Sequence, residues 1–164
     1  MDVTIREYRP ATDEAVVVEF ALRAWEPVFA SLRAVLGADL FARLHRGDEG
    51  WHAFQGAAVR RALADPSMVS FAAEVSGTAV GFVSARLTED REIGEIFMLA
   101  VNPDHQARGI GTLLTETATQ WLRQSGARVA FVETGGDPGH AAARRVYEKT
   151  SFSALPVVRY FAAL

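Results

Sequence analysis

Apolar and polar residues recur along this chain with two different periods, and the two periods predict different elements. Runs that alternate, or that are rich in β-branched residues, predict strands over residues 3–8, 67–75, 78–87, 92–101 and 127–134, and a last strand-like run over 153–164. Apolar residues at helical spacing predict helices over residues 10–29, 31–47, 51–66, 109–126 and 139–150. The predicted order is one strand, a group of helices, three strands, and then helix, strand, helix, strand.

Proline and glycine residues mark the expected boundaries of these elements. Pro27 is expected to end or kink the first helix, and Gly37 to break the second helical pattern. The Ser76-Gly77 pair lies between two β-rich runs and indicates a hairpin turn. The strand, helix and strand of the second half imply at least one parallel pair, because a crossover connection joins parallel neighbours.

Composition and charge narrow the class of protein. The 164 residues suit a single domain over 1–164 with an ordinary core, since 49% of them are hydrophobic. The net charge of −3 disfavours nucleic-acid binding, and the absence of cysteine excludes disulfides and thiolate catalysis. No signal peptide and no membrane helix are expected, which favours a cytoplasmic location. The four histidines lack metal-ligand spacing, so no metal is expected.

A basic loop with two glycines, VNPDHQARGIG over residues 101–111, separates a buried strand from a helix. Gly109 and Gly111 leave room for a ligand to approach the backbone, and Arg108 adds a positive charge. The first N–H groups of a helix have no intrahelical partner, and the helix dipole is positive there. The loop therefore predicts a site for phosphate groups. The loop is not a dinucleotide-binding fingerprint, because Leu114 occupies the position of the third glycine. It is not a P-loop either, because no Lys-Ser/Thr pair follows the glycines.

The longer string from Gln106 to Gly111 resembles the Q/R-x-x-G-x-G/A signature of the GNAT superfamily, the acetyl-CoA-dependent N-acyltransferases. LAVNP upstream resembles the exit of that family's fourth strand. GHAAARRVYEKTSF, residues 139–152, resembles its next motif, with His140 in place of the usual Asn and Ser151 in place of the usual Gly. The resemblance implies an α/β GNAT fold, with a mixed, strongly bent sheet of six or seven strands and helices on both faces.

The resemblance also implies where acetyl-CoA binds. Strand four splays from strand five in this family, and the pantetheine arm pairs with backbone groups of the strand, here Leu99, Ala100 and Val101. The N–H of Leu99 would point at the thioester carbonyl and stabilise the negative charge that develops there. The pyrophosphate contacts carry over to Arg108, Gly109, Ile110, Gly111 and Thr112, which Gln106 and Ala107 flank. The usual Asn contacts the CoA arm or its bound waters, and His140 in its place would keep a hydrogen bond there or reach the phosphates as a cation.

Two proton transfers accompany acyl transfer to an amine, because an ammonium has no lone pair and the leaving thiolate needs a proton. Tyr147 stands where the family places its acid, and is expected to protonate the CoA sulfur. Glu95 stands where several members carry a general base, and is expected to act directly or through a water. Glu92 and Glu133 are the alternatives for the base.

The acceptor side is expected to come from the first helices. The candidate contacts there are Trp25, Glu26, Phe29, Asp48, Glu49, Trp51, His52 and Phe54. The chain is thus interpreted as a transferase that moves an acetyl group to a primary amine, on a small molecule or a peptide, by direct attack in a ternary complex. The alternative is an acyl-CoA-binding module without turnover. A homodimer is possible in either case, and no membrane partner is expected.

Overall fold

Five strands form one sheet in the order in which they occur along the chain. The computed structural model describes residues 2–45, 50–90 and 92–164. The antiparallel part contains β1 (Thr4–Glu7), β2 (Met68–Val75), β3 (Thr78–Leu87) and β4 (Ile93–Val101). The last strand, β5 (Val129–Val132), lies parallel to β4. The predicted mixed α/β fold is confirmed, with five strands in the described residues rather than six or seven.

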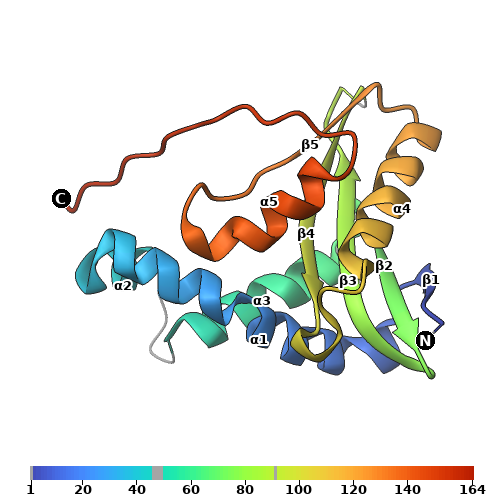
Figure 1. Ribbon diagram of the computed structural model, residues 1–164, viewed down its shortest axis with the longest axis horizontal. Coiled ribbons are helices and arrows are strands. Elements are labelled where there is room, and N and C mark those ends of the chain that lie inside the picture. Colours follow the sequence, from blue (N-terminus) through green and yellow to red (C-terminus); the bar gives the residue numbers. More distant parts are fainter. Residues whose placement is uncertain (1, 46–49, 91) are drawn as a thin grey trace.

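Helices cover both faces of this sheet (Figure 1). One face carries α1 (Pro10–Leu36) and α3 (Gly50–Ala64), whose apolar side chains pack on Phe82 and Ala100; α2 (Ala38–Leu44) lies against α1. The other face carries α4 (Ile110–Gln124), which packs on Val83 and Ile96. The short η1 (Pro103–His105) precedes α4, and η2 (Pro138–His140) leads into α5 (Ala141–Glu148).

The β2–β3 hairpin is confirmed at the predicted place. Ser76 has φ 50° and Gly77 has φ 81°, the left-handed pair that a two-residue hairpin turn requires.

The first helix is longer than the sequence pattern predicted. Of the two effects expected of Pro27, an end of the helix is wrong, because α1 continues to Leu36 and stops before Gly37, whose φ is 78°. A proline inside a helix costs about 3 kcal/mol. Burial of α1 side chains on both sides of Pro27, Phe20 before it and Phe29 after it, offsets that cost.

The predicted last strand, over 153–164, is also absent from the sheet. These residues follow α5 as an extended segment that runs away from β5 (Figure 1), and their side chains are exposed. A strand exists only when an edge accepts its backbone hydrogen bonds, and this segment joins no ladder in the structure. Within this segment Tyr160 is exposed, and Arg159 lies 3.8 Å from the carboxylate of Glu133.

In the ranges that the structure describes, none of the helices is both long enough and apolar enough to cross a membrane.

Candidate functional site

The two parallel strands separate halfway along β4. Their register ends at the pair Ile96 and Val132, whereas β4 continues to Val101 with β3 as its partner. A bulge at Phe97 shifts the β3–β4 register where the separation begins, since Ser84 faces Met98 and Ala85 faces Ile96. Bulges bend a strand and redirect its neighbours.

A cleft of about 280 Å³ lies where the strands part. Its walls come from α1, α3, β4, the end of β5 and α5, together with His45 after α2. They consist of Trp25, Val28, Phe29, Leu32, His45, Gln55, Ile96, Phe97, Met98, Leu99, Val132, Glu133, Thr134, His140, Ala143 and Tyr147.

Backbone beyond Phe97 is available on one side of β4. Leu99, Ala100 and Val101 pair with β3 on one edge, and no strand pairs with their other edge in the described part of the chain. An unpaired strand edge can accept an extended ligand as an additional strand. Of the three residues predicted to hold the pantetheine arm, Leu99 lines the cleft, and Ala100 and Val101 continue the same strand beyond it.

The glycine turn leads into α4 through two residues with positive φ. Ala107 (φ 59°) and Gly109 (φ 81°) both lie in the left-handed region, and Gly109 is the N-cap of α4 without a side-chain cap. The first amide groups of α4 thus have no side-chain acceptor at the cap. Gln106 holds the turn by donating from Nε2 to the carbonyl of Val101 at 3.0 Å.

The start of α4 lies next to the cleft. A Cβ built on Gly111 would be 3.3 Å from Val146 of α5 and 3.9 Å from Leu99. The predicted phosphate loop, up to Thr112, and the cleft wall therefore form one continuous region.

Tyr147 lines the cleft, and its ring packs edge-on against Phe152 with centroids 6.0 Å apart. Burial raises the pKa of the Tyr147 hydroxyl to about 12. The phenol is therefore protonated at neutral pH and can act as a donor.

Glu95 lies on β4 before the cleft begins. Its Oε2 accepts from Arg86 Nε at 2.7 Å, and the same guanidinium lies over the ring of Phe97, 4.7 Å from its centroid. Glu95 is not among the residues that line the cleft, whereas Glu133 is, and Glu92 is exposed outside it.

His140 is placed in the cleft wall, where its Nδ1 lies 2.5 Å from Asp137 Oδ1. The sequence analysis did not select Asp137. The signal was present, because an acid three residues before a histidine in a D-P-G turn places both side chains on one side of the turn.

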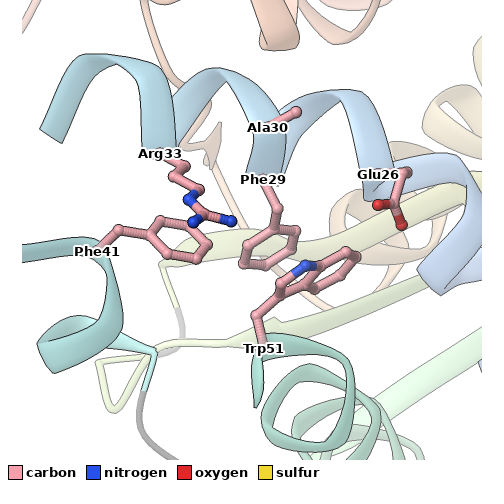
Figure 2. Close-up of a pocket in the computed structure, with 6 residues that line it drawn as sticks. All are labelled: Glu26, Phe29, Ala30, Arg33, Phe41 and Trp51. Carbon is pink, nitrogen blue, oxygen red and sulfur yellow. The ribbon is translucent and has the colours of Figure 1, made fainter. Parts of the chain in front are cut away.

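A second, smaller pocket of about 230 Å³ adjoins the cleft across Phe29, which lines both. Figure 2 shows Glu26 and Arg33 on either side of Phe29 along α1, with Glu26 on the side of Trp51 and Arg33 on the side of Phe41. The rings of Phe29 and Trp51 stack with centroids 4.0 Å apart, and Glu26 Oε2 lies 3.0 Å from His52 Nε2.

Four of the eight acceptor candidates line one or both of these cavities, namely Trp25, Glu26, Phe29 and Trp51. His52 and Phe54 line neither, and Asp48 and Glu49 lie outside the described residues. Sequence reasoning missed Arg33, Phe41, His45 and Gln55, which carry no motif. Across residues 2–45, 50–90 and 92–164, no group of three or more His, Asp or Glu side chains is arranged to hold a metal ion.

Comparison with known proteins gives relatives of one kind. The acetyltransferase (GNAT) family pattern matches residues 34–152. A mycothiol acetyltransferase of Rhodococcus jostii is 30% identical over 145 residues, which covers 72% of this chain and 47% of that protein. The chain spans about half the length of the mycothiol acetyltransferases that it matches.

Solved structures agree with the fold. An aminoglycoside acetyltransferase from an uncultured soil sample is 25% identical, with a TM-score of 0.60 over 100% of this chain and 99% of that one. The PaiA N-acetyltransferase of Thermoplasma acidophilum, solved with coenzyme A, has a TM-score of 0.64 at 15% identity and covers 91% of this chain and 88% of its own. Since the family pattern spans most of the chain and the sheet has the same architecture, this protein belongs to the acetyltransferase (GNAT) family.

Proposed function

We propose that this protein transfers an acetyl group from acetyl-CoA to the amine of a small molecule by direct attack. The observation that carries the proposal is the cleft between β4 and β5, which has the start of α4, without a side-chain cap, beside it and Tyr147 in its wall. The absence of cysteine removes the most usual covalent carrier of an acyl group and favours a ternary complex.

The residues present fit acetyl-CoA from one end to the other. The backbone of Ala107, Arg108, Gly109, Ile110, Gly111 and Thr112 would hold the pyrophosphate. The open edge at Leu99, Ala100 and Val101 would pair with the pantetheine arm. The N–H of Leu99 would then stabilise the oxyanion, and Tyr147 would protonate the sulfur.

A small amine fits the acceptor side, because aromatic walls and a carboxylate meet there. Trp25 lines the cleft, and Glu26 and Trp51 line the adjoining pocket. Similarity to an aminoglycoside acetyltransferase supports an acceptor of this class.

The test is thiol release from acetyl-CoA with a panel of amines: aminoglycosides, amino sugars, polyamines and peptides with a free N-terminus. Release that depends on one class of amine is expected, with the acetylated amine detected by mass spectrometry. Tight binding of CoA with no release across the panel would instead indicate a binding module.

A substitution in the glycine turn should separate phosphate binding from folding. We expect Gly109→Ala to weaken CoA binding about tenfold, because a Cβ at positive φ costs about 1–2 kcal/mol and shifts the amides that face the phosphates. Calorimetric titration with CoA measures this. Gly77→Ala is a matched control, since Gly77 also has φ 81° and open space at its Cβ but lies in the β2–β3 turn. Equal affinities in the two variants would contradict the assignment of the loop.

If the acceptor binds in the adjoining pocket, a substitution in its wall should change the KM for the acceptor. We expect Trp51→Ala to raise the KM for the acceptor about tenfold, as loss of one aromatic wall does, while the KM for acetyl-CoA stays constant. Steady-state kinetics with the acceptor that the thiol-release panel identifies measures both constants. Val35→Ala, an exposed position on α1 that lines neither cavity, is the control. A change in the KM for acetyl-CoA alone would place Trp51 outside the acceptor site.

A further inference from the structure

An aspartate and a histidine form a pair in the wall of the cleft. Asp137 Oδ1 lies 2.5 Å from His140 Nδ1, and the two side chains are 11% and 20% exposed. Because a carboxylate accepts and does not donate, the neutral imidazole carries its proton on Nδ1. Its other nitrogen, Nε2, has no hydrogen-bond partner among the described residues and bears the lone pair.

The carboxylate of Asp137 is kept ionised. Ser31 of α1 donates to Asp137 Oδ2 at 2.5 Å, and the N–H of Gly139 donates to the same oxygen at 3.1 Å. Burial alone would raise the pKa of Asp137, but the hydrogen bonds from Ser31 and His140 outweigh it and hold the pKa below its usual range.

The loop that carries the pair is fixed in place. Arg144 Nη1 donates to the carbonyls of Gly135, at 2.5 Å, and Asp137, at 2.9 Å. A Cβ on Gly135 would collide with both members of the pair, and one on Gly139 would collide with Ser31. Close packing on several sides therefore sets the position of the imidazole.

His140 is on the acceptor side of the cleft. Its neighbour Gly139 lies against the backbone of Pro27 and Val28 in α1. Further along α1, Phe29 and Leu32 line the cleft, and Phe29 also lines the adjoining pocket. An amine bound among these residues and directed at the thioester would pass the imidazole.

We infer that His140 is the general base of the reaction, that its Nε2 takes the proton from the acceptor's ammonium, and that Asp137 is its positioning residue. This inference rests on the proposed function. It transfers the role of base from Glu95, which is paired with Arg86 outside the cleft, to a side chain inside it.

The protons balance over the reaction. The ammonium gives one proton to Nε2 of His140, which passes it to solvent. The free amine attacks the thioester carbon, the C–N bond forms and the C–S bond breaks. Tyr147 gives its proton to the sulfur, and the second proton of the attacking nitrogen replaces it. The products are the amide and free CoA.

Other charged and titratable groups line the same cleft or hold the loop of His140. Glu133, Tyr147 and His45 line the cleft with it, Asp137 pairs with it, and Arg144 of α5 binds the carbonyl of Asp137. Ser31 is the polar group that α1 contributes, and it is neutral.

The test compares His140→Gln with wild type on two acceptors, the alkyl amine found by thiol release and hydroxylamine, which is already neutral at pH 8. We expect kcat to fall about 100-fold with the alkyl amine and at most a few-fold with hydroxylamine, with an unchanged Kd for CoA. Free imidazole should restore part of the rate of His140→Ala. In Asp137→Asn we expect His140 no longer to be held in its Nδ1–H tautomer, and ¹⁵N NMR of the His140 ring measures this change.

Several results would overturn the inference. One is an equal loss with both acceptors, and another is a loss of CoA affinity without a loss of kcat, which would make His140 a cofactor contact. A 100-fold loss in Glu95→Gln beside an active His140→Gln would return the role to Glu95. Absence of thiol release in the wild type is a different outcome, because it refutes the proposed function and not the assignment of the base alone.

Discussion

Replacing Tyr147 by phenylalanine should lower kcat by about 100-fold or more, with little change in the KM for acetyl-CoA. The hydroxyl donates to a sulfur whose negative charge exists only as the C–S bond breaks. Its loss therefore weakens the transition state and leaves substrate binding nearly unchanged. The phenylalanine ring keeps the edge-on contact with Phe152, so the fold is retained.

Steady-state kinetics measures kcat and KM of the variant, and a thermal melt checks that its fold is retained. Tyr160→Phe is the matched control, because it removes the same hydroxyl group from a residue outside the cleft. Tyr160 is 89% exposed on the segment after α5. Because the pKa of Tyr147 is raised to about 12, the rate should show no alkaline loss from this group below about pH 11. A variant with wild-type kcat would show that the thiolate leaves without an acid.

The parts of this site that the sequence predicted are those set by local backbone. The glycines before a helical run predicted the turn at the start of α4, where Gly109 adopts a φ of 81° that few other residues adopt. The β4 segment and Tyr147 follow from motifs that surround the same cleft.

The parts that the sequence did not predict depend on contacts between distant segments. Ser31 donates a hydrogen bond to Asp137, which lies 106 positions further along the chain, and no periodicity or motif spacing in the sequence predicts such a pair. The length of α1 was misjudged for a related reason, since the burial of Phe20 and Phe29 decides whether a helix survives Pro27. For residues 153–164 the β-propensity predicted a strand, but no edge strand of the sheet pairs with this segment.

A buried ion pair at the first turn of α1 should contribute more to stability than any other polar contact described above. Asp13, 2% exposed, accepts two hydrogen bonds from the guanidinium of Arg6, at 2.6 and 3.0 Å, and one from the N–H of Arg9 at 2.8 Å. Burial alone would raise the pKa of Asp13, but the bonds from Arg6, Arg9 and Thr12 outweigh it and lower the pKa. The pair fastens the start of α1 to β1.

Asp13→Asn should therefore lower the free energy of unfolding by about 2–3 kcal/mol, since it leaves a buried guanidinium with only part of its partners. Arg6 keeps its ion pair with Glu74, at 2.6 Å, so the loss of stability is smaller than for a charge with no partner. Glu74→Gln, at the more exposed partner, should cost less than about 1 kcal/mol. Urea unfolding at pH 7 measures both.

The same substitution should flatten the acid side of the stability profile. A carboxylate with a lowered pKa stabilises the fold above the pKa of the unfolded chain, near 3.9, and loses that contribution as the pH falls through its folded value. Wild type should thus lose stability between about pH 5 and the folded pKa more steeply than Asp13→Asn does. Parallel profiles for the two proteins would contradict the account. Because Asp13 lies at the opposite end of α1 from the cleft residues Phe29 and Leu32, kcat at 25 °C should be the same in both, which separates the loss of folding from any loss of chemistry.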